Sequence, residues 1–295
     1  MTMIKDTRIS MQTRIDPLIA NRARWLLAQR PGTPVLRHAL HRILGYGARL
    51  ALAEHLRDLP AARVMAELAA HIARDVTVTG CHHIPAHGPA LVVANHATGI
   101  ADGIILHHVL ATRHPDAFFF ANADVLAVLP QLGDIIAPVE WRHDRRCHAK
   151  ARATMTATRA ALAAGRLGVI FPSGRLAKRR GLRLHERPWM ASAAMLARKF
   201  DLPVIPVHIR ARNSALFYAF DAIHPTLRNI TLFHETLNKA RQPFRLTIGP
   251  AIAATDLPTD TDAAIAYLRR ATLSLGGHGM PQVSLLQASR RPGRA

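Results

Sequence analysis

The segment from Ala90 to Asp102 decides the fold, and it reads ALVVANHATGIAD. Its first five residues are all apolar, a pattern typical of a strand that is buried on both faces of a sheet. A polar turn follows, and the apolar run from Ile104 to Leu110 predicts a helix. A strand, a short loop and a helix in this order form the repeating unit of α/β domains.

Similar patterns recur on both sides of this segment. Further strands are expected at 76–79, 117–121, 135–141, 167–171, 204–209 and 244–248. Helix-like segments lie at 147–164, 189–200 and 261–275. Because strands alternate with helices, we expect an α/β fold with a mixed, largely parallel sheet flanked by helices.

The part before the first strand is expected to be a helical extension. Apolar positions between Val35 and Leu59 recur at three- and four-residue steps, which predicts an amphipathic helix broken around Gly45 and Gly47. A second helix is expected at 61–74. These helices can pack on the core, lie in a membrane interface with their arginines reaching the headgroups, or do both with different faces.

The charge of the chain favours anionic partners. There are 39 Lys and Arg against 19 Asp and Glu, a formal net charge of +20. Between Arg142 and Arg187 the only acids are Asp144 and Glu186. Such a field suits phospholipid headgroups, CoA, acidic carrier proteins or nucleic acid. No apolar run is long enough to span a membrane, no secretory signal is recognisable and two cysteines offer no disulfide framework, so we expect a cytoplasmic protein.

The polar turn after the first quoted strand carries the candidate chemistry. His96 follows the strand directly, at the sheet edge where α/β folds bind ligands. The loop can bring Asp102 back to it, so that the carboxylate holds one ring nitrogen while the other accepts a proton from a hydroxyl. We therefore expect His96 as general base and Asp102 as its partner. Their neighbours Asn95, Thr98 and Gly99 are candidate substrate-binding residues.

This turn resembles the first motif of the glycerolipid acyltransferase family, the relatives of lysophosphatidate acyltransferases, and later segments follow in that family's order over residues 76–209. The usual motif is Asn-His, four residues and Asp, whereas five residues lie between His96 and Asp102 here. The family's second motif, a strand-end arginine that binds the acceptor phosphate, corresponds to Arg142. The fourth, an apolar strand with an internal proline, corresponds to the segment from Val204 to Val207.

The family's third motif, Phe-Pro-Glu-Gly-(Thr or Ser)-Arg, appears as Phe171, Pro172, Ser173, Gly174 and Arg175. Serine replaces the glutamate, and the arginine comes one position early. Independently of the resemblance, such a turn lets the backbone approach an anion closely, and the arginine can bind a phosphate through two hydrogen bonds. We expect these five residues to contact the substrate.

The resemblance implies an enzyme that moves a fatty acyl group from acyl-CoA or acyl carrier protein to a hydroxyl of a lysophospholipid, without a cofactor. The family's default acceptor is 1-acyl-glycerol-3-phosphate, and the altered motifs leave room for another lysophospholipid or a lyso-aminolipid such as lyso-ornithine lipid. The chain then divides into an N-terminal helical, membrane-apposed region (1–75), an acyltransferase domain (76–280) and a basic tail (281–295). Such an enzyme would attach peripherally to the anionic inner face of the cell membrane.

Two other functions compete with this interpretation. A hydrolase of acyl esters or thioesters would use His96 and Asp102 with water as the nucleophile. A non-enzymatic nucleic-acid-binding protein would fit the pI of about 11.6, but aromatic residues make up only 5% and no reader module is recognisable, so we expect no nucleic acid. The histidines near Cys81 match no common zinc spacing, and we expect no metal.

Overall fold

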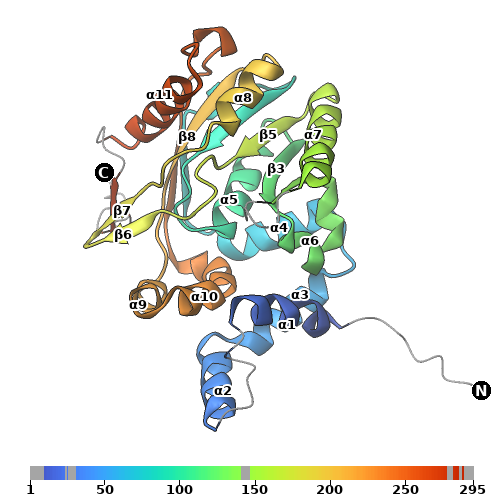
Figure 1. The fold of residues 1–295 in the computed structure, drawn as a ribbon, viewed down its shortest axis with the longest axis vertical. Coiled ribbons are helices and arrows are strands. Elements are labelled where there is room, and N and C mark those ends of the chain that lie inside the picture. Colours follow the sequence, from blue (N-terminus) through green and yellow to red (C-terminus); the bar gives the residue numbers. More distant parts are fainter. Residues whose placement is uncertain are drawn as a thin grey trace, which may run out of the picture.

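A seven-stranded sheet forms the centre of the molecule (Figure 1). The structure, a computed structural model, describes residues 10–23, 25, 31–140, 147–277, 282–285 and 288. The strands lie in the order β1 (Val76–Thr79), β9 (Phe244–Ile248), β8 (Val204–Arg210), β2 (Ala90–Ala94), β5 (Leu167–Ile170), β3 (Ala117–Asn122) and β4 (Ile136–Val139). Neighbouring strands are parallel except β8 and β9, which confirms the expected mixed, largely parallel sheet.

Helices cover both faces of this sheet, and the side chains of β2 show why its sequence is apolar throughout. Ala90, Val92 and Ala94 pack in one core cluster with α4 (Ala61–Ile72) and α5 (Ile100–Leu110). Leu91 and Val93 belong to a second cluster, on the opposite face. That face is covered by α7 (His148–Ala163), α8 (Ser192–Lys199) and α11 (Thr261–Ser274). A strand buried on both sides has no position left for a polar residue until it ends.

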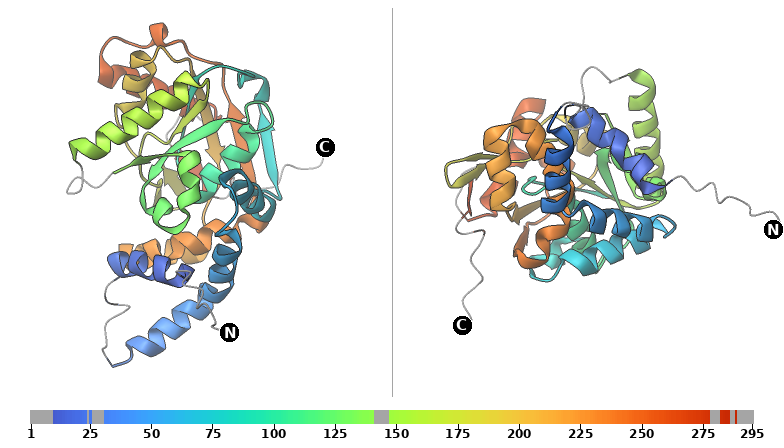
Figure 2. Two further views of the ribbon diagram at one scale, coloured as in Figure 1. Left: turned by 90° about the vertical axis from the view of Figure 1, so that its right-hand side faces the viewer. Right: turned by 90° about the horizontal axis from the view of Figure 1, so that it is seen from below.

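Helices also precede the first strand, as the sequence predicts. They are α1 (Met11–Arg22), α2 (Thr33–Ile43), α3 (Tyr46–Leu56) and α4. Gly45, with φ of 59°, separates α2 from α3, which is the break expected there. α2 extends away from the sheet (Figures 1 and 2) and leaves Val35, Leu36 and Ile43 exposed. Among the described residues, no helix combines the length and apolarity needed to cross a bilayer.

Several elements lie where the sequence indicated none. A hairpin of β6 (Lys178–Arg180) and β7 (Arg183–His185) turns at Gly181, which has φ of 57°. β10 (Gln282–Ser284) pairs with β7, so part of the segment expected to be a basic tail adds a strand to this hairpin. The remaining helices are α6 (Asp124–Val128), α9 (Ala215–Ile223) and α10 (Pro225–Leu237), of which the last two lie together at one end of the sheet (Figure 1).

A buried ion pair connects the end of α10 to the loop before α9. The side chains of Glu235 and Lys239 are fully buried, and the ammonium Nζ lies 3.0 Å from the Glu235 carboxylate. It also donates to Oδ1 of Asn213 at 2.6 Å and to the carbonyl oxygen of Arg212 at 3.1 Å, so all three of its hydrogens have acceptors. Burial acts to raise the pKa of Glu235, but Lys239 and hydrogen bonds from Ser214 outweigh it and hold that pKa below its usual value.

Candidate active site

His96 and Asp102 meet at the carboxyl end of β2. The strand ends at Ala94, and Asp102 lies in the first turn of α5. Nδ1 of His96 is 3.0 Å from Oδ2 of Asp102, whose side chain is fully buried, whereas 19% of the His96 side chain is exposed. With the Nδ1 hydrogen donated to the carboxylate, Nε2 carries the lone pair that can accept a proton.

Thr98 and Gly99 hold the carboxylate of Asp102 in place. Oδ2 accepts hydrogen bonds from the backbone N–H of Thr98 at 2.8 Å and of Gly99 at 3.1 Å, and Oδ1 accepts one from the Thr98 hydroxyl at 2.5 Å. Gly99 has φ of 105°, a conformation that favours glycine and lets the five-residue spacing close. The structure thus shows both residues bonded to Asp102, and their contact with a substrate stays a prediction.

Asn95 links this turn to the neighbouring strand. Its amide nitrogen donates to the carbonyl oxygen of Ile209 at 2.9 Å, and its amide oxygen accepts from the Ile209 N–H at 2.7 Å. The side chain is buried, with 3% exposed. It thereby continues the hydrogen bonding between β2 and β8 beyond the end of β2, and its role in substrate binding stays a prediction.

The turn that begins at Phe171 lies directly against His96. The Phe171 and His96 rings stack with centroids 4.5 Å apart, and the backbone N–H of Ala177 donates to the carbonyl oxygen of His96 at 2.8 Å. His96 and Phe171, which are 75 positions apart in the sequence, therefore pack side by side in the site. The histidine ring is partly exposed beside this turn, as a proton acceptor for a substrate must be.

The other residues of this turn divide into a buried and an exposed half. Pro172 and Ser173 are buried, and the Ser173 hydroxyl donates to the carbonyl oxygen of Arg175 at 2.9 Å. Gly174, with φ of 56°, and Arg175 are exposed, so the arginine is accessible to an anion. Arg142, the other candidate for phosphate binding, lies outside the described residues.

Glu186 is a residue near His96 that the sequence did not single out. Its Oε2 accepts a hydrogen bond from the backbone N–H of His96 at 3.2 Å, and its Oε1 accepts one from Nε1 of Trp189 at 3.0 Å. Burial raises the pKa of Glu186, although the Trp189 and His96 hydrogen bonds and the nearby imidazole oppose this rise. Glu186 lies 90 positions from His96, so sequence spacing gave no indication of the contact.

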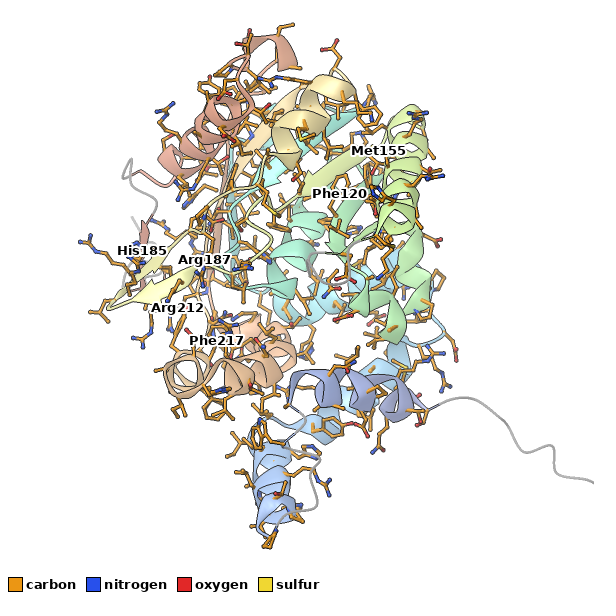
Figure 3. The ribbon with its side chains drawn as sticks, in the orientation of Figure 1. Phe120, Met155, His185, Arg187, Arg212 and Phe217 are labelled. Atoms are coloured by element: carbon orange, nitrogen blue, oxygen red, sulfur yellow. The ribbon has the colours of Figure 1, made fainter. Side chains whose placement is uncertain are left out.

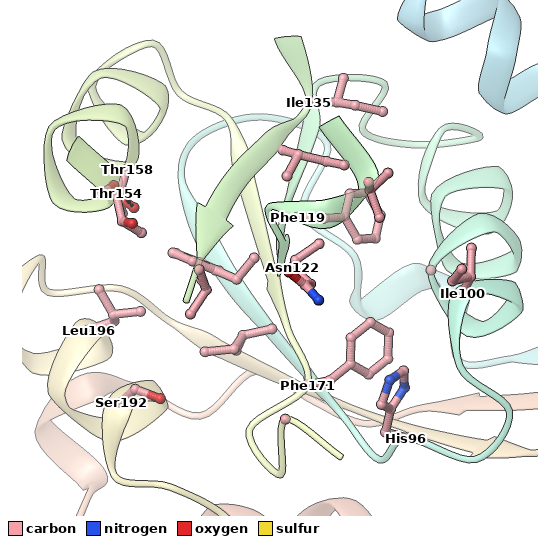
Figure 4. Close-up of a pocket in the computed structure, with 18 of the residues that line it drawn as sticks. His96, Ile100, Phe119, Asn122, Ile135, Thr154, Thr158, Phe171, Ser192 and Leu196 are labelled. Atoms are coloured by element: carbon pink, nitrogen blue, oxygen red, sulfur yellow. Dashed lines mark hydrogen bonds between the residues drawn. The ribbon is translucent and has the colours of Figure 1, made fainter. Parts of the chain in front are cut away.

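A large apolar cavity opens beside His96 and runs between the sheet and the helices (Figure 4). Its volume is about 860 Å³. His96 and Phe171 lie at one side, and Thr154 of α7 and Leu196 of α8 lie at the other (Figure 4). Because most of its lining is aliphatic or aromatic, the cavity suits a long hydrocarbon chain rather than a polar molecule.

Cationic side chains flank the opposite side of the turn. Arg187 follows Glu186, which accepts a hydrogen bond from the His96 backbone. Arg212 lies three residues after Ile209, which is hydrogen-bonded to Asn95. Both arginines are therefore close in the chain to residues that contact the His96 turn. Figure 3 labels both, between the hairpin and α9. The Nε of each is buried and donates no hydrogen bond within the described part of the chain. Such donors are suited to an anionic ligand, because an unpaired buried donor is costly.

No metal site accompanies these residues in the part of the chain that the structure describes, where no three His, Cys, Asp or Glu side chains gather suitably. Near the N-terminal edge of the sheet, His82 and His83 contact each other with ring centroids 4.1 Å apart. His96 and the groups around it are suited to proton transfer, to anion binding and to burial of an apolar chain.

Comparisons with known proteins match the part of the chain that contains these residues. The model of the family described as Acyltransferase matches residues 75–210, a range that contains His96, Asp102 and the turn at Phe171. The lyso-glycine lipid O-acyltransferases of Phocaeicola vulgatus and Bacteroides thetaiotaomicron are 25% and 24% identical over 183 residues, 60% of this chain. The matches span 64% and 65% of those two proteins, less than two thirds of their length.

A solved structure is also similar. It is the 1-acyl-sn-glycerophosphate (LPA) acyltransferase PlsC from Thermotoga maritima, with 16% identity and a TM-score of 0.47. The similarity covers 90% of this chain and 97% of that one.

Proposed function

Because the chain belongs to the acyltransferase family, we propose that it transfers a fatty acyl group from a thioester to a hydroxyl of a lysolipid. The observation that carries this proposal is the His96–Asp102 pair: Nδ1 of His96 lies 3.0 Å from a buried carboxylate, and His96 lines an apolar cavity. The pair supplies a base for the acceptor hydroxyl, and the cavity supplies a place for the acyl chain. A base and a hydrocarbon site in contact are what acyl transfer to a lipid alcohol requires.

In the proposed reaction, Nε2 of His96 takes the proton of the acceptor hydroxyl as its oxygen attacks the thioester carbonyl carbon. The new C–O bond forms a tetrahedral intermediate, the C–S bond then breaks, and the proton on His96 passes to the leaving thiolate. Asp102 stabilises the imidazolium that exists between these two transfers. No covalent bond between the acyl group and the protein is needed.

The acyl chain of the donor is proposed to occupy the cavity. Phe119 and Ile135 line the cavity, whereas Asn122 is one of its polar side chains (Figure 4). The Asn122 amide is already engaged with Asp124, both as donor at 3.2 Å and as acceptor at 3.0 Å. The cavity can therefore exclude water along a hydrocarbon chain while His96 remains at its opening.

The headgroup of the acceptor is proposed to bind on the cationic side of the turn. Arg175 is exposed there, and Arg187 and Arg212 each offer a buried Nε–H. Three residues of extended chain span at most about 10 Å, so Arg212 cannot be far from Ile209 and the His96 turn. Guanidinium groups bind carboxylates and phosphates through paired hydrogen bonds. Either anion fits this surface.

The acceptor that we propose to test first is a lyso-aminolipid, because the two curated relatives are lyso-glycine lipid O-acyltransferases. The family's default acceptor, 1-acyl-glycerol-3-phosphate, is the second. Both carry an anionic group and a free hydroxyl. The donor is either acyl-CoA or acyl carrier protein, and both are anionic thioesters.

Attachment to an anionic membrane at the cytoplasmic face is part of the same proposal, since the acceptor resides in a bilayer. The net charge of +20 attracts anionic lipids, and α2 projects with Val35, Leu36 and Ile43 exposed between basic residues. Each Lys or Arg near such a surface contributes about 1 kcal/mol, so a few suffice for reversible binding. The attachment is expected to weaken with salt.

An acyl-transfer assay tests the function. Purified protein is mixed with acyl-CoA or acyl carrier protein and with each of several lysolipids, and acylated lipid, free fatty acid and free thiol are measured. We expect acylated lipid from the wild-type protein and none from His96→Ala, with the exposed His87→Ala as a matched control that keeps full activity. Acylated lipid from a correctly folded His96→Ala protein would refute the assignment. Release of fatty acid alone, regardless of the acceptor, would identify a hydrolase instead.

A further inference from the structure

Glu186 has no role in the steps above, yet it touches the residue that performs them. Its side chain enters the site from the loop after β7, and only 7% of the residue is exposed. Burying a carboxylate costs free energy unless hydrogen bonds and charges compensate it. Two N–H groups point at its oxygens, and one of them is the backbone N–H of His96, at 3.2 Å.

The surrounding segment is anchored in a way that keeps this carboxylate in place. The carbonyl oxygen of Glu186 accepts a hydrogen bond from Arg269 at 3.1 Å, and the backbone N–H of Met190 donates to the carbonyl oxygen of Pro172 at 3.0 Å. Trp189, which donates to the carboxylate, is itself buried in the core behind the sheet. The segment that contains Glu186 is thus hydrogen-bonded both to α11 and to the turn that begins at Phe171.

His96 therefore lies between two carboxylates that reach different parts of it. Asp102 bonds the ring at Nδ1, and Glu186 bonds the main chain of the same residue. A negative charge near an imidazole favours its protonated form, and a hydrogen bond to its main chain fixes where the ring is presented. We propose that Glu186 is a positioning residue that holds His96 beside the cavity and stabilises the imidazolium formed during acyl transfer. This inference rests on the proposed function.

Ser173 provides a second, independent observation. The serine occupies the position where the resemblance leads one to expect a glutamate, and it is one of the neighbours that oppose the burial-driven rise in the pKa of Glu186. The Ser173 hydroxyl donates its one proton to the Arg175 carbonyl oxygen at 2.9 Å. A carboxylate from position 186 thus reaches the space that a longer acidic side chain at position 173 would fill.

This arrangement makes the effect of one substitution depend on the other. In the wild-type background, Ser173→Glu places two carboxylates in one buried site, so we expect lower stability and activity. In a Glu186→Ala background the same change restores one carboxylate and leaves the total side-chain volume nearly unchanged. Ser173→Glu should therefore harm the wild-type protein and help the Glu186→Ala variant.

The experiment measures kcat and KM for the thioester donor in the single and double variants, together with Tm. We expect Glu186→Ala to lower kcat about 10- to 100-fold with KM unchanged, less than the loss of the base itself. Adding Ser173→Glu should recover about tenfold of that loss. A kcat of Glu186→Ala equal to wild type, or a Ser173→Glu effect of the same sign in both backgrounds, would overturn the proposal.

Two further variants separate positioning from structural support. Trp189→Phe removes the other hydrogen bond to Glu186 without removing its charge, so we expect a lower Tm and a smaller loss of kcat than in Glu186→Ala. If it lowers kcat as much as Glu186→Ala does, the role of Glu186 is only structural. Should the double variant fail to fold, Glu186→Gln replaces it: the side chain keeps its size and loses its charge, and an unchanged kcat would contradict the proposal.

Failure of the proposed function would look different. In that case the wild-type protein makes no acylated lipid from any acceptor, whereas failure of the present inference leaves an active wild type with active Glu186 variants. Hydrogen exchange at the His96 amide then tests the contact without an assay of activity. Exchange should be faster in Glu186→Ala than in wild type, and equal rates would show that the hydrogen bond to Glu186 is absent.

Discussion

Replacing Asp102 with asparagine removes a charge from the site with almost no change in shape. Oδ2 of Asp102 accepts three hydrogen bonds, from His96, Thr98 and Gly99, whereas Oδ1 accepts only one, from the Thr98 hydroxyl. An asparagine can place its oxygen at the Oδ2 position and its NH2 group opposite the hydroxyl, which rotates to accept. The structure therefore predicts that Asp102→Asn folds, with a stability loss of about 1–3 kcal/mol from weaker hydrogen bonds.

The catalytic loss should be larger, because the imidazolium loses its counter-charge. Two unit charges at the 3.0 Å separation of Nδ1 and Oδ2 interact by about 5.5 kcal/mol at an effective dielectric constant of about 20. A net charged hydrogen bond contributes about 1.5–3 kcal/mol, which sets the lower limit. At about 1.4 kcal/mol for each tenfold, kcat should fall between about 10- and 10⁴-fold.

The assay follows thiol release and acylated lipid with purified Asp102→Asn at saturating donor and acceptor. Thr98→Val is the comparison variant: it removes the hydrogen bond to Oδ1 but keeps the carboxylate, so kcat should fall less than in Asp102→Asn. If Asp102→Asn keeps wild-type kcat while its Tm stays close to wild type, the carboxylate does not stabilise a charged His96. Equal losses in the two variants would mean that loop geometry, not charge, limits the rate.

Other parts of the structure lead to further expectations. Met155 lines the cavity, so Met155→Trp should shift donor preference towards shorter acyl chains, and an unchanged profile in competition assays with mixed donors would place the chain elsewhere. Burial lowers the pKa of His208 to about 4, so the unfolded chain binds a proton on this histidine before the folded chain does as the pH falls. Acidification from pH 7 to 4 should therefore cost the wild type up to about 3 kcal/mol of stability that His208→Phe does not lose. Parallel curves of Tm against pH for the two proteins would contradict this. Replacing Val35 and Ile43 with serine should weaken co-sedimentation with anionic vesicles, and added salt should weaken it in the wild type; binding unaffected by either would exclude α2 and charge as the attachment. Arg187→Ala should raise KM for the lysolipid with little change in kcat, whereas an unchanged KM would remove Arg187 from the headgroup site.

The central layer of the fold could be predicted because its signals are local. Five consecutive apolar residues from Ala90 to Ala94 require burial on both faces, and a histidine immediately after them must emerge at the edge of the sheet. The same local logic applies to Gly99, whose conformation allows the chain to return Asp102 to the ring. The expected strand at 135–141 is longer than β4, which ends at Val139, and residue 141 lies outside the described residues.

Other features depend on contacts that no local pattern encodes. Glu186 appeared only as an acid in a basic stretch, and its partner His96 is 90 positions away. The hairpin of β6 and β7 has a local signal, the glycine at its two-residue turn, but its strands are short and rich in arginine and lack the alternating apolar residues that predict a strand. α9 and α10 were not predicted, although Pro225 at the start of α10 is a recognisable helix-initiating residue.

The Glu235–Lys239 pair restricts how this protein can change over evolutionary time. Removing one partner of a buried ion pair strands the other charge and costs about 3–5 kcal/mol, a large share of the roughly 5–15 kcal/mol that separates folded from unfolded domains. Replacing both with apolar residues of similar volume is often neutral. Descendants of this sequence should therefore keep both residues or lose both, and a homologue carrying only one should show a compensating change at Asn213 or Ser214.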